Sequence, residues 1–169
     1  YFFILSILGD LMKKTKIALI TDSTNDIPQA LIEQYEIAVV PLTIVWGGKS
    51  YLDGVDLTAG EFYQRLKIDP SHPTTSQPAP ADFLRAYEKA FDAGAEEVIA
   101  LTISSAMSGT MESARTAAEQ AKLPVRLIDS HSNSMSLGWQ VLACARALET
   151  GASVEEAVLA AEKVRSKVH

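Results

Sequence analysis

The chain has 169 residues, of which 47% are hydrophobic, so it is long enough to bury a core of its own, and we expect a single domain. A formal net charge of -6 argues against nucleic acid or an anionic membrane surface as the main partner. The single cysteine, Cys144, excludes an internal disulfide and fits a cytoplasmic protein. Together with the three histidines it shows no metal-ligand spacing, so we expect no metal site.

The first eleven residues differ from the rest of the chain. Residues 1–9 are apolar, but they are far fewer than the ~20 residues that span a bilayer. They also lack the basic leader and the cleavage site of a signal peptide. Met12 looks like a natural start directly before the first strand pattern, so we interpret residues 1–11 as an upstream extension from a misplaced start codon or from cloning. An amphipathic anchor is the alternative, and no stable membrane insertion is expected.

The rest of the chain alternates between strand and helix patterns. Short apolar runs predict strands at 16–22, 37–46, 97–103 and 125–129, and the glycine pair at 47–48 predicts a hairpin with 49–52. Capping residues, prolines and apolar stripes predict helices at 28–35, 61–66 (with Thr58 as its cap), 80–93, 110–121, 137–150 and 153–168. The alternation indicates an α/β fold, a three-layer sandwich with a mostly parallel central sheet.

Two details of these elements can be tested directly. Pro41 interrupts the second strand run, which favours an edge position or a bulge. Phe83, Tyr87 and Phe91 recur every four residues and predict one buried face of the helix that follows Pro80.

Two uncharged segments rich in hydroxyl groups stand out. Residues 74–78 read Thr-Thr-Ser-Gln-Pro, and residues 104–110 read Ser-Ser-Ala-Met-Ser-Gly-Thr. Each precedes a predicted helix, and hydroxyls with helix N-termini can hold an anion without lysine or arginine. Helix capping accounts for about one hydroxyl in each segment, and four in residues 104–110 exceed that need. We therefore expect these segments to capture a ligand head group.

Three polar turns follow the ends of predicted strands, namely residues 22–24, 104–110 and 129–132. The carboxyl ends of parallel strands meet at one edge of a sheet, where such folds bind their ligands. The sheet should therefore gather the three turns there, with the segment around Thr75 and Ser76 closing over them as a loop. For that segment, a proline-rich turn leading into a helix is the alternative.

An enzymatic interpretation of the same edge stays open. Asp22, Asp129 or His131 could serve a small-molecule phosphotransferase or hydrolase. No G-x-S-x-G, P-loop or G-x-G-x-x-G pattern is present, so we favour neither a serine hydrolase nor ATP or dinucleotide binding. We expect no catalytic residue and no cofactor. A structural fragment without a ligand of its own is the third interpretation.

Taken in order and spacing, several short segments of the chain resemble the DegV family of bacterial fatty-acid-binding proteins. The matching segments are Ile20–Thr24, Val39–Leu42, Phe62-Tyr63, Thr75–Pro78, Ile103–Ser105 with Ser108–Thr110, and Ile128–Ser130. The resemblance runs from Lys16 to about His169. It implies that residues 12–169 form a DegV-type N-terminal α/β domain, with the second domain of that family absent from this chain.

The resemblance implies a protein that buries one long-chain fatty acid in a tunnel between its two domains. The carboxylate would meet the hydroxyls of Thr75, Ser76 and Ser105, with Ser104 and Ser108 close by. Basic or polar side chains of the second domain would help to hold the head group. In such a protein the fatty acid is presented to a separate fatty acid kinase, so the chain itself is expected to be a carrier and not an enzyme.

The resemblance also implies how this chain departs from its family. We expect Ile44, Phe83 and Met107 in the tunnel wall, with Met107 standing where leucine is frequent. Ala79 stands where serine is common, which removes a helix cap worth ~1 kcal/mol. Without the second domain half of the tunnel is missing. We therefore expect weak fatty-acid binding or none, and an exposed inner face that offers a surface for dimerisation.

Overall fold

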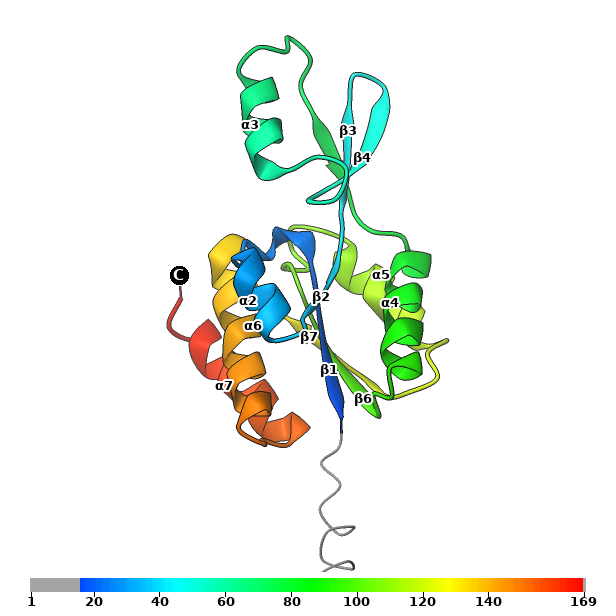
Figure 1. Ribbon diagram of the computed structural model, residues 1–169, viewed down its shortest axis with the longest axis vertical. Helices are drawn as coiled ribbons and strands as arrows, with labels where there is room; N and C mark the ends of the chain where they lie inside the picture. Colours follow the sequence, from blue (N-terminus) through cyan, green and yellow to red (C-terminus); the bar gives the residue numbers. More distant parts are fainter. Residues whose placement is uncertain (1–15, 169) are drawn as a thin grey trace, which may run out of the picture.

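The computed structural model describes residues 16–168, so the expectations for residues 1–11 lie outside the described part. Figure 1 shows an α/β domain with a small lobe standing above one end of its sheet. The lobe has a small hydrophobic core of its own. Within residues 16–168, no helix combines the length and the hydrophobicity needed to cross a bilayer.

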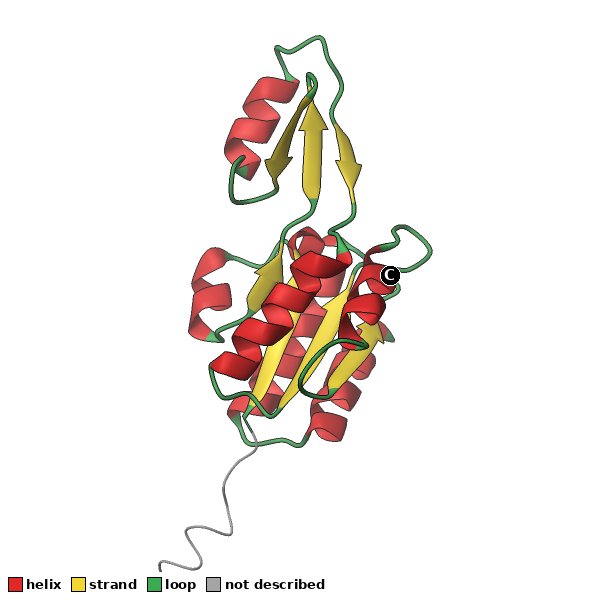
Figure 2. Ribbon diagram, turned by 90° about the vertical axis from the view of Figure 1, so that its right-hand side faces the viewer, coloured by secondary structure: helices red, strands yellow, loops and turns green. Residues whose placement is uncertain are grey.

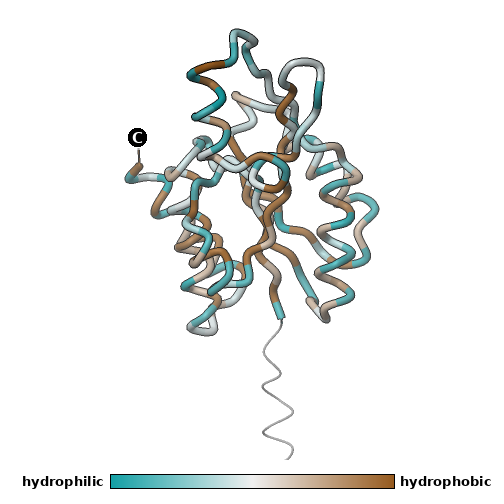
Figure 3. The backbone as a smooth tube through the Cα atoms, turned by 45° about the horizontal axis from the view of Figure 1, so that its top comes forward, coloured by the Kyte–Doolittle hydropathy of each residue, from teal (hydrophilic) through white to brown (hydrophobic). Residues whose placement is uncertain are grey.

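The central sheet of the main domain is parallel and has the strand order β2-β1-β6-β7. Its strands are β1 (Ile17–Asp22), β2 (Ala38–Val40), β6 (Glu97–Thr102) and β7 (Val125–Asp129). Strands covered by helices on both faces read as continuous apolar runs, which is why β1 and β6 were visible in the sequence. Figure 3 shows the hydrophobic stretches concentrated along these strands.

Helices cover both faces of this sheet (Figure 2). On one face lie α4 (Pro80–Asp92) and α5 (Thr110–Ala118), and on the other lie α2 (Gln29–Gln34), α6 (Ser134–Glu149) and α7 (Val154–Arg165). The side chains of each strand alternate between the two cores. Leu19 packs toward α6 and its neighbour Ile20 toward α4 and α5. This arrangement confirms the predicted three-layer α/β sandwich.

The small lobe carries a second sheet, which is antiparallel and has the order β4-β3-β5. The elements of the lobe are β3 (Thr43–Trp46), β4 (Lys49–Leu52), the helix α3 (Ala59–Leu66) and β5 (Thr74–Ser76). As predicted, β3 and β4 form a hairpin, and a capping box between Thr58 and Glu61 starts α3.

The predicted strand at 37–46 is two strands in two different sheets. β2 belongs to the parallel sheet and β3 to the lobe, with Pro41 between them. Pro41 cannot donate a backbone hydrogen bond to a sheet, so the chain leaves the main sheet there. The expectation of an edge position is met, because β2 is an edge strand, but the bulge is absent.

The segment around Thr75 and Ser76 was predicted as a loop and is instead the strand β5. This strand pairs with β3 on the side opposite β4, with Ile44 opposite Thr75 and Thr43 opposite Ser76. Its three polar residues carry no strand pattern of their own. The unpaired backbone groups along β3 supply the partner that makes this segment extended.

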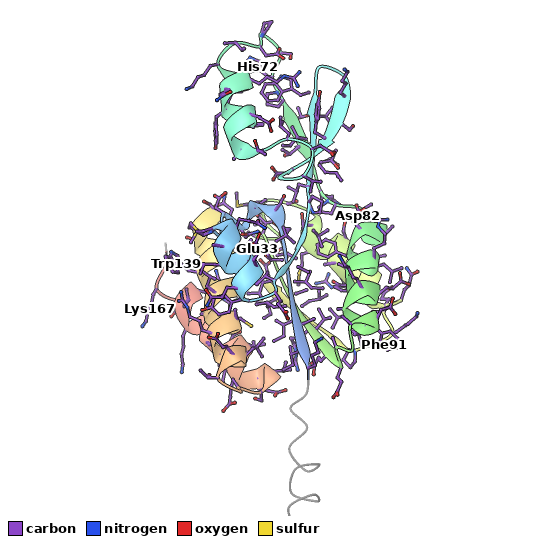
Figure 4. The ribbon with its side chains drawn as sticks, in the orientation of Figure 1. Glu33, His72, Asp82, Phe91, Trp139 and Lys167 are labelled. Carbon is purple, nitrogen blue, oxygen red and sulfur yellow. The ribbon has the colours of Figure 1, made fainter. Side chains whose placement is uncertain are left out.

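The helix α4 confirms two of the three predicted buried aromatic residues. Phe83 and Tyr87 lie in the core, whereas Phe91 is 42% exposed in the last turn, with the ammonium of Lys122 5.5 Å from its ring centroid. Figure 4 shows Asp82 at the lobe end of α4 and Phe91 at the opposite end. The Asp82 carboxylate accepts a hydrogen bond from the Ala79 amide at 2.8 Å, so the first turn keeps one capping bond without a serine.

Candidate functional site

A cavity of ≈830 Å³ lies between the small lobe and the carboxyl ends of the parallel strands. Its walls come from the turn after β1, the lobe, residues 103–109 and the start of α6. The serine and threonine side chains of these walls are Ser23, Thr24, Thr75, Ser76, Ser108 and Ser134, and Tyr63 adds a phenol hydroxyl. The sequence analysis placed a ligand site at this edge, and the structure has a cavity of ligand size there.

The three polar turns meet at this edge as predicted. The Ile103 amide donates to Asp22 at 2.7 Å, which joins the turn after β1 to the segment after β6. The Ser104 amide donates to the Ser132 carbonyl at 2.9 Å, which joins the same segment to the turn after β7. Backbone donors therefore hold the three turns together before any ligand is considered.

Asp22 serves as the link between these turns. It is fully buried, and its two carboxylate oxygens accept from Ile103 and from the amide and hydroxyl of Thr24, the hydroxyl at 2.6 Å. Burial raises the pKa of Asp22 above its ordinary value, although these hydrogen bonds act in the opposite direction. The contacts fit a structural carboxylate that starts the turn η1 (Ser23–Asn25), and they favour no catalytic role for Asp22.

Ser104 and Ser108 spend part of their hydrogen-bonding capacity on the turn before α5. Ser104 is buried, and its hydroxyl accepts from the Ala106 amide at 3.3 Å. The Ser108 hydroxyl accepts from the Thr110 amide at 3.3 Å and lies 2.9 Å from the Thr110 hydroxyl. Ser108 also lines the cavity, so it is the one member of this pair that faces a ligand space.

Ser105 is exposed and is not among the residues that line the cavity. Its hydroxyl donates to Asp129 at 2.5 Å, and its amide faces the same carboxylate at 3.3 Å. Partial burial raises the pKa of Asp129, but hydrogen bonds from Ser105 and from the His131 amide outweigh it, so the pKa lies below its ordinary value.

His131 also contacts Asp129, but Ser105, Asp129 and His131 do not form a catalytic triad. Its Nδ1 lies 3.4 Å from Asp129, so the carboxylate sits between the serine and the imidazole. A nucleophilic serine needs the imidazole as its direct proton acceptor. The geometry therefore favours neither a serine nucleophile nor the hydrolase alternative.

The apolar part of the cavity agrees with two of the three predicted wall residues. Ile44 and Met107 line it, and Met107 is 60% exposed on its rim. Phe83 does not, because it is fully buried between α4 and the parallel sheet in the core of the main domain. The further apolar wall residues are Leu42, Ala59, Phe62 and Ile103.

The charges along the described walls are negative. Asp26 and Asp53 line the cavity, and lysine and arginine are absent from its described lining residues. Asp53 accepts from the Ser23 hydroxyl at 2.7 Å, and Asp26 accepts from the Ser134 hydroxyl. Groups of three or more potential metal-ligating side chains are also absent from residues 16–168. The walls thus offer hydroxyl donors without a basic side chain.

Sequence reasoning found Thr75, Ser76 and Ser108 but missed other parts of the cavity. Gln77 and the start of α6 at Ser134 both line it. The predicted start of that helix at residue 137 was three residues late, which hid Ser134. The signal was available, since a helix that follows a strand end in a parallel sheet begins at the ligand-binding edge.

These features describe an α/β protein with a ligand-sized cavity at the carboxyl edge of its sheet, the usual position of a binding site in this class. A family model described as "Uncharacterised protein, DegV family" matches residues 16–169. The chain belongs to the DegV family.

Curated relatives carry the same family name. A DegV domain-containing protein of Caldanaerobacter subterraneus subsp. tengcongensis is 45% identical over 147 residues, covering 85% of this chain and 51% of the relative. One of Deinococcus radiodurans is 38% identical over 148 residues, covering 88% of this chain and 52% of the relative. The chain spans about half the length of the curated relatives that it matches.

Solved structures of the family share the fold. A DegV family protein from Thermus thermophilus, described by its fatty acid binding, has a TM-score of 0.81 at 38% identity. The match covers 89% of this chain and 54% of the Thermus thermophilus chain. DegV from Bacillus subtilis, described as a fatty acid binding protein, has a TM-score of 0.83 at 30% identity, with coverages of 90% and 54%.

Proposed function

We propose that this chain forms one half of a long-chain fatty-acid site, in which Thr75, Ser76 and Ser105 anchor the carboxylate with Ser104 and Ser108 beside them. One observation carries the proposal. Thr75 and Ser76 from the lobe and Ser108 from the main domain line the same cavity as the apolar wall. Relatives described as fatty-acid-binding proteins support the choice of ligand.

The physical chemistry of the ligand fits these walls. An ionised carboxylate is costly to remove from water unless it accepts hydrogen bonds. Each hydrogen bond to a charged group contributes about 1.5–3 kcal/mol, and each buried methylene of the tail adds ~0.8 kcal/mol. The hydroxyls thus place the head group, and the tail on residues such as Ile44 supplies most of the affinity.

The role of Ser105 in this proposal requires an exchange of partners. Its hydroxyl donates to Asp129, so a ligand carboxylate would replace one acceptor by another. The two carboxylates on the cavity wall, Asp26 and Asp53, add repulsion. The resemblance to the DegV family implies that basic or polar side chains of a second domain would supply the compensating charge.

As a carrier, the protein would present its bound fatty acid to a fatty acid kinase, which makes the acyl phosphate. Purified kinase, ATP and oleate provide the assay. Acyl phosphate formation should depend on this protein when it is joined to the second domain. ATP consumption by this chain without the kinase, lost on replacing Asp129 or His131 by alanine, would instead indicate an enzyme.

The binding proposal is tested by titration with oleate and palmitate, and by mass spectrometry of lipids extracted from the purified protein. Replacing Thr75 or Ser76 by alanine should lower the affinity by about 10-fold or more, since each change removes a hydrogen bond to a charged group. Thr74→Ala is the matched control, because Thr74 lies in the same strand but does not line the cavity. Affinities equal to wild type in both Thr75→Ala and Ser76→Ala would contradict the head-group assignment.

A further inference from the structure

The side chain of Gln77 lies directly on Gly109, across the junction between the lobe and the main domain. A Cβ atom built on Gly109 would lie 2.3 Å from Gln77 Oε1 and 2.7 Å from its Nε2, closer than real Cβ atoms approach other groups. The Gln77 Nε2 also donates to the hydroxyl of Ser113 at 3.3 Å, and Ser113 is buried in α5. The amide group of Gln77 therefore fills the space that a side chain at residue 109 would need.

The backbone at Gly109 does not require glycine. Its φ of -75° and ψ of 7° are accessible to any amino acid. A position with a left-handed backbone favours glycine, because other amino acids are strained in that conformation. Gly109 does not have a left-handed backbone, so strain does not explain the glycine. Space is therefore the reason for a glycine here, and Gln77 is the group that uses the space.

Gln77 is also placed where it can act on the candidate site. It directly follows β5, the strand that carries Thr75 and Ser76. Gly109 directly follows Ser108, which lines the opposite wall of the cavity. The contact thus joins the two hydroxyl-bearing segments at their adjoining residues.

The lobe joins the main domain through two short links, and each has one side-chain attachment. On the β3 side, the Leu42 amide donates to the Ser23 hydroxyl at 3.0 Å, and that hydroxyl donates to Asp53. On the β5 side, the described attachment is Gln77 on Gly109 and Ser113. Removing the second attachment would free the end of the lobe that carries Thr75 and Ser76.

We propose that Gln77, seated on Gly109, is a positioning residue that sets the separation between the Thr75–Ser76 strand and the Ser108 segment. The consequence for fatty-acid affinity rests on the proposed function, but the effect on lobe position does not. Because the far end of a flexible side chain is what a larger residue 109 would displace, Gly109→Ala should release Gln77 without unfolding the protein.

The test compares wild type, Gln77→Ala, Gly109→Ala and the double variant. Spin labels on Lys49→Cys in the lobe and Glu88→Cys in α4 report the distance between the two regions without ligand, and Cys144 is buried in the main core. Each single variant should broaden the distance distribution to the same extent, and the double variant should add nothing. Two controls should leave it unchanged, Gly60→Ala, which meets open space in α3, and Gln64→Ala on the exposed side of the same helix.

Two results would overturn the proposal. One is a distribution unchanged in both single variants, and the other is an effect of Gly109→Ala that is as large without Gln77 as with it. Oleate titration then tests the functional part, with an expected loss of about 10-fold in each single variant and no further loss in the double variant. If wild type binds no oleate, the proposed function fails while the distances still decide the role of Gln77. If the distances shift and the affinity does not, the role in binding is overturned.

Discussion

The main domain and the small lobe face each other across the cavity, but they differ in how much they bury. Leu101 and Leu137 are fully buried in a core that joins the parallel sheet to α6 and α7, and a second core lies under α4 and α5. The described buried cluster of the lobe consists of Ile44, Trp46 and Leu57. The lobe, which carries Thr75 and Ser76, therefore has a smaller core than the main domain, which carries Ser108. We expect the lobe to unfold locally at a lower free energy than the main domain.

The largest expected effect comes from the main core. Leu101→Ala should lower the free energy of unfolding by about 2–5 kcal/mol, because it removes a fully buried side chain from a packed sheet. Burial raises the pKa of Cys144 to about 12, so its thiol reacts with a disulfide reagent only when the core opens. The rate of that reaction should rise in Leu101→Ala and stay at the wild-type value in Leu159→Ala, whose side chain is exposed on α7. Equal rates in both variants would show that the core does not unfold as a unit.

A large but local effect is expected from Trp46 in the lobe. Its ring is fully buried, and the centroids of the Trp46 and Phe62 rings lie 5.1 Å apart. The guanidinium carbon of Arg65 lies 4.5 Å from the centroid of the Trp46 ring. Trp46→Ala should raise amide hydrogen exchange in β3, β4 and β5 by at least ~100-fold, since truncating a buried tryptophan costs about 3–5 kcal/mol. The reactivity of Cys144 should not change.

A faster reaction of Cys144 in Trp46→Ala would mean that the lobe and the main domain unfold together. Trp139→Ala is the control, because this side chain is 47% exposed on α6 and its loss should alter neither measurement.

A smaller effect separates the two regions through matched helix caps. Thr58 caps α3 in the lobe and Ser153 caps α7 in the main domain, each within a capping box. Alanine at either position should cost ~1 kcal/mol. Ser153→Ala should shift the global denaturation midpoint, whereas Thr58→Ala should change only hydrogen exchange in the lobe. Thr58→Ser and Ser153→Thr keep the cap and should behave as wild type.

The smallest expected effect is a dependence of the lobe on pH. Hydrogen bonds from the hydroxyl and amide of Ser71, followed by the Arg65 guanidinium, lower the pKa of Asp69 from 3.8 to about 2. A lowered folded pKa means that the contribution is fully present above pH 3.8 and is lost as the pH falls toward 2. Carboxyl NMR should show this titration, and Ser71→Ala should move it upward. Asp69→Asn should remove this part of the acid sensitivity, and a titration of Asp69 at its ordinary value would contradict the contacts.

The sequence predicted the main domain better than the lobe for a physical reason. Strands β1 and β6 are buried on both faces, so their sequences are continuous apolar runs that can be recognised as strands. The strand β5 has no apolar pattern, because Thr74, Thr75 and Ser76 are exposed. These residues form a strand only through pairing with β3. Which sheet a strand joins at Pro41 likewise depends on the tertiary structure.

The candidate site was predictable to a similar degree. The convergence of the three polar turns follows from the parallel sheet, so the position of Ser108 at this edge was predictable. Thr75 and Ser76 were expected to close over the same edge and do line the cavity, but as a strand of the lobe and not as a loop. The contact of Ser105 with Asp129 spans 24 positions and that of Gln77 with Ser113 spans 36. Neither has a local pattern, and only the folded chain brings these partners together.

The pairing of Thr43 with Ser76 makes the lobe a modular insertion in the connection from β2 to α4. The first and last residues of the lobe are opposite neighbours on β3 and β5, and such neighbours lie roughly 5 Å apart. A short turn could therefore close the gap while the strand order of the parallel sheet stays the same. Mutations and insertions between these two residues can reshape one wall of the cavity while the other wall, and the fold that carries it, remain as they are.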